Sequence, residues 1–93
     1  MRTVELTRFR VEPSRVDDLL KARPAMLRDF REDRAGFVEA RLVRLPGDEW
    51  LDIVFWAGPE DFAASRAKGA NQPGIKAFFD AIAEVVSTEE GTS

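Results

Sequence analysis

Proton chemistry in this chain has few side chains available to it. The 93 residues include no His, no Cys and no Tyr. Disulfides, thiolate catalysis and zinc–thiolate sites are therefore excluded, and so is the commonest general base. Any proton transfer by a side chain must use Asp, Glu, Lys or Arg. Among these Asp52 draws attention, because it interrupts the most apolar stretch of the chain, Glu49–Phe62.

The residues around Asp52 are expected to form a strand that is apolar on both faces. Side chains alternate along a strand, so one face carries Leu51, Ile53, Phe55 and Ala57, and the other carries Trp50, Asp52, Val54 and Trp56. Such a strand needs cover on both sides. A chain this short supplies helices for one face only, so a second copy of the protein is expected to cover the other.

Asp52 has two candidate roles. A carboxylate in a half-dry interior can act as a base that takes a proton from a phenol or an activated CH₂ group. Alternatively, Asp52 forms a cross-strand ion pair with Arg41 on the same face, and the two roles do not exclude each other. Arg41 is also the candidate that stabilises the resulting anion. Glu39 is an alternative base or ligand contact; otherwise it is a solvated carboxylate near the end of its strand.

Aromatic side chains near Asp52 suggest a planar aromatic ligand. Trp56 is the candidate stacking wall, and the alternative is that Trp56 and Trp50 fill a dimer interface. Phe37 and Phe62 are expected to line the same pocket, or to pack as core. Asn71 is expected to cap the pocket mouth or to serve its own turn.

Composition and charge limit the possible partners. The net charge of −3 argues against a nucleic-acid backbone, which requires a basic surface. No apolar run approaches the roughly 20 residues that span a bilayer, and the N-terminus lacks a signal-peptide pattern. One cytoplasmic domain over residues 1–93 is expected, with no metal site and no cofactor.

The remaining elements follow from periodicity and breakers. Strands are expected at Thr3–Val11, Phe37–Leu45 and Val85–Thr88. A helix capped by Ser14 should run to Gly36 with a kink at Pro24. A second helix should start at Pro59 and end near Lys68, and a third should carry Ile75, Phe78, Phe79 and Ile82. Residues 89–93 are expected to be a frayed tail.

Three points of register stay open. A bulge near Thr7–Arg8 would bring Val4, Leu6, Phe9 and Val11 to one side; otherwise this strand is apolar on different faces at its two ends. An even-length loop after Leu45 is preferred, which places Phe37, Glu39 and Arg41 beside Asp52 and leaves Leu51, Ile53 and Phe55 under the helices. Val85–Thr88 is either an edge strand or the end of a helix.

The order of elements is β-α-β-β-α-β with a broken last helix, which is the ferredoxin-like α+β arrangement. Right-handed crossovers put the helices on one face of a four-stranded antiparallel sheet. The other face, expected to carry Trp50, Trp56, Phe37 and Val54, is too apolar to stay exposed. Two such sheets would close a dimeric α/β barrel.

This order, the Gly36-Phe37 entry into the second strand and the run Phe55-Trp56-Ala57-Gly58-Pro59-Glu60-Asp61-Phe62 resemble the antibiotic biosynthesis monooxygenase superfamily over nearly the whole chain. The resemblance implies a homodimer with one pocket between sheet and helices in each subunit. Some relatives oxidise polyketide anthrones with molecular oxygen and no cofactor; others degrade haem, and related barrels isomerise or cyclise small molecules.

The chain departs from the family at three positions. Quinone-forming members have an Asn where this chain has Asp52 and a Tyr where it has Phe62; haem-degrading members have an iron-ligating His where it has Arg66. The expected function is a cofactor-free monooxygenase acting on an aromatic or polyketide-type molecule. The alternatives are a small-molecule binder, a dimerisation module, and an isomerase or cyclase.

Overall fold

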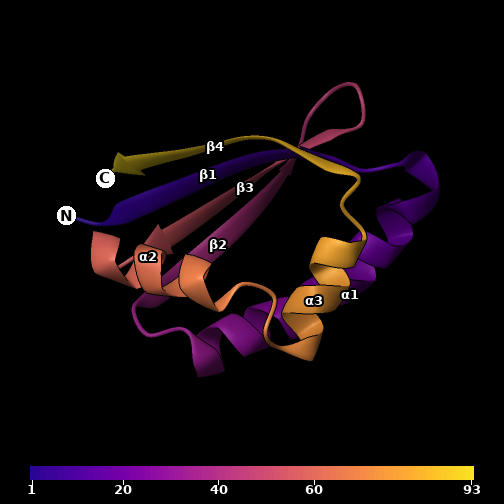
Figure 1. The fold of residues 1–93 in the computed structure, drawn as a ribbon. Coiled ribbons are helices and arrows are strands. Elements are labelled where there is room, and N and C mark those ends of the chain that lie inside the picture. The colour runs from indigo at the N-terminus through magenta and orange to yellow at the C-terminus, as the bar shows by residue number, and fades with distance from the viewer.

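The computed structural model describes all 93 residues as one α+β unit (Figure 1). Its strands are β1 (Thr3–Arg10), β2 (Phe37–Arg44), β3 (Glu49–Trp56) and β4 (Glu84–Thr92). Its helices are α1 (Val16–Asp33), α2 (Pro59–Lys68) and α3 (Pro73–Asp80), with a 3₁₀ turn at Pro13–Arg15 before α1. No helix is both long enough and apolar enough to cross a bilayer.

The four strands form one antiparallel sheet in the order β2-β3-β1-β4. All three helices lie on one face of this sheet, and the two chain ends lie side by side at one end of it (Figure 1). The ferredoxin-like fold expected from the sequence is therefore confirmed. The break between α2 and α3 falls at Gly69–Gln72, as the Gly and Pro residues there predicted.

The assignment of the two faces of β3 was wrong. Trp50, Val54 and Trp56 are buried in the core beneath the helices, together with Phe30 and Phe62. Asp52 shares their face and is only 8% exposed. Leu51, Ile53 and Phe55 lie on the opposite, helix-free face. Because both faces of β3 are apolar, alternation alone could not say which one the helices cover.

The preferred even-length hairpin loop was also wrong. Arg44 pairs with Trp50, which leaves the five residues from Leu45 to Glu49 between them. Leu42 therefore lies opposite Asp52, and Arg41 lies opposite Ile53 on the helix-free face. A register shift between Phe37 and Glu39 places Phe37 opposite Trp56 nonetheless. The odd-length loop thus puts Glu39 and Arg41 on the face opposite Asp52, and the bulge returns Phe37 alone to the face that carries Asp52.

The edge of the sheet at β4 is longer than the sequence suggested. β1 pairs with β3 without interruption, so Val4 and Leu6 lie on the helix-free face while Phe9 lies beneath the helices, as in the alternative weighed for this strand. The bulge falls in β4, between the residues paired with Arg8 and Phe9. The last residues are paired, not frayed: Arg2 and Ser93 exchange backbone hydrogen bonds of 2.8 and 2.9 Å.

Helix α1 brings its apolar stripe onto the sheet. Leu19, Met26 and Phe30 are buried along it, and Pro24 lies within it. Ser14 lies in the 3₁₀ turn and does not cap α1, whose N-cap is Arg15. Helix α3 approaches α1 closely at Gly74, where a Cβ would meet the Ala25 carbonyl carbon at 2.6 Å. The Gly74 amide donates to Asp29 Oδ2 at 2.7 Å there.

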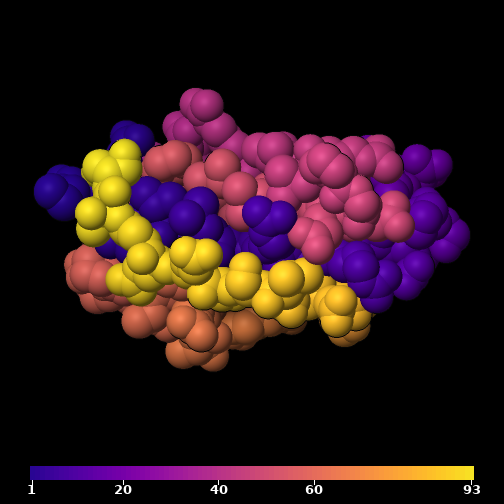
Figure 2. Space-filling model, turned by 90° about the horizontal axis from the view of Figure 1, so that it is seen from above, coloured from indigo at the N-terminus to yellow at the C-terminus, as the bar shows by residue number.

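The helix-free face is open to solvent, and Figure 2 looks onto it from above. The strip of β4 runs beside β1 there, and the side chains of β3 and β2 follow on the far side (Figure 2). By the strand register, this face carries Val4, Leu6, Val43, Leu51, Ile53 and Phe55. It is apolar at its centre, but not because of the residues that were expected there.

Candidate active site

A cavity of about 520 Å³ lies between the sheet and the helix layer. Strands β1, β3 and β4 supply one wall, and residues of α2, α3 and the C-terminal end of α1 supply the other. Its apolar lining includes four aromatic rings, those of Phe9, Phe30, Phe78 and Phe79, together with the aliphatic Val54 and Ile82. The volume falls within the ~300–1,000 Å³ typical of small-molecule sites.

Asp52 lines this cavity but is held by a cation. Arg23 Nη1 donates to Oδ2 at 2.7 Å and Nη2 to Oδ1 at 2.9 Å, a bidentate pair. Both side chains are 11% exposed, and the guanidinium lies 5.1 Å from the centre of the Phe78 ring. The predicted pairing of Asp52 with Arg41 is therefore wrong. Both Asp52 oxygens already accept charge-assisted hydrogen bonds, so protonating it would sacrifice those bonds.

Glu5 is a second carboxylate in the cavity. It lies opposite Val54, next to the Thr7–Asp52 pair on the same face of the sheet. Its closest donor is a neutral one: Trp56 Nε1 donates to Glu5 Oε1 at 3.1 Å. Glu5 takes part in none of the ion pairs of the structure, unlike Asp52.

Burial raises the pKa of Glu5 above its usual range, and the nearby negative charge of Asp52 adds to this effect. The Trp56 hydrogen bond and the Arg66 cation oppose it but do not cancel it. A desolvated carboxylate prefers its neutral form. Glu5 is thus closer than an ordinary Glu to exchanging a proton near neutral pH, which is the property of a general base or acid.

Arg66 of α2 supplies an uncommitted cation in the cavity wall. It forms no ion pair or side-chain hydrogen bond within the chain, and its guanidinium lies 5.5 Å from the centre of the Phe62 ring. Its charge is felt at Glu5, where it favours the ionised carboxylate. Arg66 therefore has the free donors that the exposed Arg41 was expected to offer.

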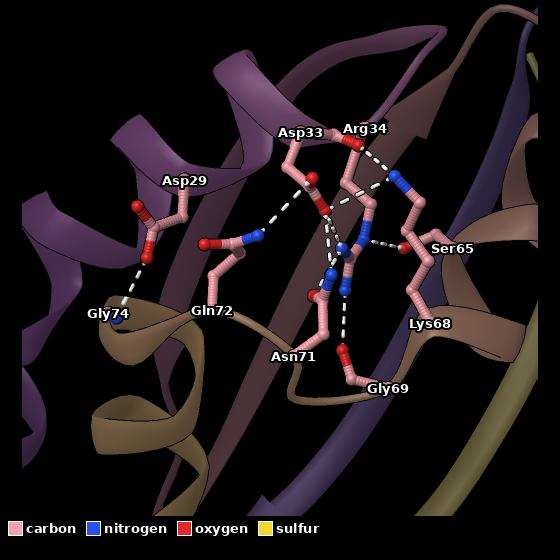
Figure 3. Close-up of polar contacts among 9 residues, drawn as sticks. All are labelled: Asp29, Asp33, Arg34, Ser65, Lys68, Gly69, Asn71, Gln72 and Gly74. Atoms are coloured by element: carbon pink, nitrogen blue, oxygen red, sulfur yellow. Dashed lines mark hydrogen bonds and ion pairs between the residues drawn. The ribbon is translucent and has the colours of Figure 1, made fainter.

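A polar cluster borders the cavity through Arg34, Ser65 and Gly69. We call it the tether; it also includes Asp33, Lys68, Asn71 and Gln72, and Figure 3 shows its contacts. Its centre is Arg34, which follows α1 and is only 5% exposed. Arg34 Nε donates to Ser65 Oγ at 2.8 Å, Nη1 donates to Asp33 and Asn71, and Nη2 donates to the Gly69 carbonyl. Every guanidinium nitrogen is engaged, so the tether fixes the α2–α3 loop to the end of α1.

Asp33 is the anionic member of the tether. Besides Arg34, it accepts from Asn71 Nδ2 at 3.0 Å, from Lys68 Nζ at 3.2 Å and from Gln72 Nε2 at 3.3 Å (Figure 3). The hydrogen bond from Asn71 is the main cause that holds the pKa of Asp33 below its usual range, and Lys68 and Arg34 add to it. Asn71 thus serves the loop, not an open pocket mouth.

The sequence-predicted site residues fall into three places. Asp52 lines the cavity. Trp56 is fully buried, stacked on Phe62 with 6.4 Å between ring centres and flanked by Phe30 and Phe37. Of these rings only Phe30 lines the cavity; Trp56, Phe37 and Phe62 form core beside it, and Trp56 is linked to the cavity through its hydrogen bond to Glu5. Glu39 and Arg41 lie on the helix-free side, where they pair with each other at 3.2 Å.

Sequence reasoning missed Glu5, Arg23 and Arg34. For the two arginines a signal existed: Leu19, Arg23, Met26, Phe30 and Arg34 follow one helical stripe at spacings of three and four. A cation within an apolar stripe requires a buried anion. Glu5 gave a weaker signal, since a Glu in a strand is more often exposed to solvent. Only the register with β3 places it in the cavity.

Comparison with solved structures identifies the fold. The chain superposes on a candidate antibiotic biosynthesis monooxygenase from Bordetella bronchiseptica with a TM-score of 0.82 and 17% identity, over 99% of this chain and 96% of that one. A second from Chloroflexus aurantiacus gives 0.70 and 20%, over 100% and 93%. SnoaB from Streptomyces nogalater, a cofactor-independent oxygenase, gives 0.66 and 20%, over 97% and 88%.

Sequence comparison adds nothing to this, since no family model and no curated protein matches the chain. Nor do three His, Cys, Asp or Glu side chains gather anywhere in the structure in a way that could hold a metal ion. The structural matches are close over nearly the full length of both partners. The chain has the fold of the antibiotic biosynthesis monooxygenases.

Proposed function

We propose that this protein is a cofactor-free monooxygenase that oxidises a planar aromatic or polyketide-type molecule in the cavity between sheet and helices. The observation that carries the proposal is a desolvated carboxylate, Glu5, in the wall of a cavity of about 520 Å³ that four Phe rings also line. SnoaB, which has this fold, is a cofactor-independent oxygenase. An anthrone-sized ligand fits such a volume.

The reaction requires a proton acceptor, an anion-stabilising group and molecular oxygen. A cavity carboxylate, Asp52 or Glu5, takes a proton from the activated CH₂ group; the C–H bond breaks and a carboxyl O–H bond forms. The electron pair stays on the ligand as a delocalised anion, which passes an electron to oxygen. The overall change converts CH₂ and O₂ into a carbonyl group and one water molecule, and O₂ is the oxidant.

Oxygen uptake tests this proposal. Purified protein is mixed with anthrone in air-saturated buffer without metal or flavin, and autoxidation in buffer is subtracted. The proposal requires protein-dependent uptake with one anthraquinone formed per O₂ consumed. Isomerised or cyclised product without uptake would instead support a proton-transfer enzyme on the same scaffold. Quenching of Trp fluorescence without turnover would support a binder.

We further propose that a second copy of the chain covers the helix-free face. Leu6, Ile53 and Phe55 form the centre of an apolar surface with no helix over it, and a solvent-facing patch of this kind is unusual in a monomer. The Glu39–Arg41 and Arg8–Glu49 pairs lie at its margins. Two such sheets facing each other would form the barrel expected from the sequence.

Light scattering after size-exclusion chromatography tests the dimer. The wild-type chain should elute as a dimer, and Phe55→Asp should shift it to a monomer, because a charge would be buried in the interface. Glu90→Gln, on the helix-facing side of β4, is the matched control and should remain dimeric. A monomeric wild-type protein would contradict the proposal.

A further inference from the structure

We propose that Glu5, not Asp52, is the residue that takes the proton from the ligand, and that Arg66 holds the anion so formed. This inference rests on the proposed ligand cavity. It concerns proton transfer alone, however, so it can be tested separately from any later reaction with oxygen.

The two carboxylates of the cavity differ in how they are paired. Asp52 is neutralised by Arg23 through two hydrogen bonds of 2.7 and 2.9 Å, so accepting a proton would break an almost buried ion pair. Glu5 has no cationic partner at bonding distance, and its Trp56 contact at 3.1 Å is a neutral one. Glu5 can therefore gain and lose a proton without dismantling its surroundings.

Strand β1 and the Trp56 indole hold Glu5 in a fixed position at the cavity. Glu5 lies in the middle of β1, paired with Val54 on one side and Glu90 on the other, and it borders the cavity. The indole N–H of Trp56 fixes one carboxylate oxygen. An anchored carboxylate on a strand is held more firmly than one on a loop, which is what a catalytic base requires. Trp56 is thus a positioning residue.

Arg66 is placed to balance the negative charge that proton transfer leaves on the ligand. When Glu5 takes the proton, the charge moves from the carboxylate to the ligand. Arg66 borders the same cavity and has no partner within the chain. It balances the charge of Glu5 before the transfer and that of the ligand anion afterwards. Arg34 also borders the cavity, but its nitrogens are already engaged in the tether.

Charged groups from several neighbouring elements surround Glu5, but of these only Asp52 and Arg66 shift its pKa. Asp52 on β3 and Glu90 on β4 are the anions beside it, Glu84 borders the cavity farther along β4, and Arg66 on α2 and Arg34 after α1 are the cations. Desolvation and Asp52 prevail over Arg66, and the pKa of Glu5 is raised. Proton abstraction should therefore become faster as pH increases, with a midpoint above the ordinary Glu range of ~4.3.

Hydrogen–deuterium exchange of anthrone tests the assignment without oxygen. Anthrone is incubated anaerobically in D₂O with the protein, and the loss of its CH₂ signal is followed by ¹H NMR. The wild-type protein should accelerate exchange over buffer. Glu5→Gln keeps an oxygen for the Trp56 hydrogen bond but cannot take a proton, so it should lose at least about 100-fold of the acceleration.

Three variants make the result specific. Glu90→Gln removes a carboxylate from the strand position opposite Glu5 and should leave exchange within about twofold of wild type. The double variant Arg23→Gln/Asp52→Asn removes both charges of the ion pair and should retain exchange within about tenfold. Arg66→Gln should slow exchange by about tenfold while Glu5 still titrates in the pH profile. These fold-changes follow from general-base and charge-stabilising contributions of ordinary size.

Loss of exchange in the double variant but not in Glu5→Gln would assign the base to Asp52 and overturn the inference. A wild-type protein that exchanges no faster than buffer would overturn it as well. Rapid, Glu5-dependent exchange without oxygen uptake in air would keep Glu5 as the base and refute the monooxygenase. Oxygen uptake that survives Glu5→Gln would refute Glu5 as the base and keep the monooxygenase.

Discussion

The two polar clusters beside the cavity differ in how completely they are satisfied. In the tether, Arg34 and Asp33 use nearly every donor and acceptor they have, and the pKa of Asp33 is lowered. On the sheet, Glu5 has one neutral hydrogen bond at 3.1 Å, and its pKa is raised. A saturated cluster stabilises its ionised state and fixes a wall. An unsaturated one leaves a group free to exchange a proton.

The Arg23–Asp52 pair lies close to Glu5, but, as in the tether, its charged groups are fully paired. Breaking this pair should have the largest effect on stability. Asp52→Asn should lower the free energy of unfolding by about 3–5 kcal/mol, because it leaves Arg23 charged and unpaired in an almost buried position. Urea denaturation measures this. Arg23→Gln/Asp52→Asn should recover most of the loss, and a single variant as stable as wild type would contradict the pair.

Removing the centre of the tether should have the next largest effect. Arg34→Met should cost about 2–4 kcal/mol, because the buried Ser65 hydroxyl and the partly buried Gly69 carbonyl lose a charged donor. Arg34→Lys keeps the charge but lacks the planar guanidinium group, so its free energy of unfolding should lie between those of wild type and Arg34→Met. Amide hydrogen exchange should increase at residues 69–72 in Arg34→Met. Unchanged protection there would show that the loop is held by other contacts.

Glu5→Gln should change stability less, and in the opposite direction. Because the folded-state pKa of Glu5 is raised, its contribution is fully present below the unfolded pKa of ~4.3. It is lost as pH rises through the folded pKa. The neutral amide avoids this loss, so the variant should gain on wild type as pH increases. Urea midpoints measured across pH check this, and parallel curves would mean that Glu5 is solvated in the folded protein.

Asp33→Asn should have the smallest effect, with the opposite pH dependence. The pKa of Asp33 is lowered in the folded protein, so its contribution is present above the unfolded value of ~3.9. It is lost as pH falls through the folded value. The variant should be slightly less stable than wild type at neutral pH and equal to it in acid. Thermal unfolding at the two pH values measures this, and a constant difference would contradict the lowered pKa.

The element order and the fold could be predicted because caps, breakers and periodicity are local. Pro59 at the start of α2 and the Gly69–Gln72 break worked in this way. The face of β3 could not be assigned, since Trp50 and Trp56 are as suited to an interface as to a core. In the sequence, Asp52 suggested that its face of β3 is the more solvated one, because a lone carboxylate is costly to bury. Its partner, Arg23, lies 29 residues away on α1.

The hairpin error had a different origin. The number of residues in the loop between Arg44 and Trp50 decides whether Arg41 faces the helices or the open side, and Pro46 and Gly47 mark a turn there without fixing its length. The β-bulge between Phe37 and Glu39 then returns Phe37 to the face of Asp52, and no Gly or Pro within it predicts the shift. Site residues that depend on register were therefore the least predictable. Glu5 emerges only when β1, β3 and the Trp56 indole are brought together.

The central claim is that the helix-covered cavity, not the open face of the sheet, is where the ligand binds. Titration of ¹⁵N-labelled protein with anthraquinone, followed by amide chemical shifts, tests it most directly. The account predicts saturable shifts at Thr7, Val54, Ser65, Gly69 and Phe78, which border the cavity, with Arg41, Val43 and Leu51 unmoved. Shifts confined to Arg41, Val43 and Leu51 would place the ligand on the open face and contradict it.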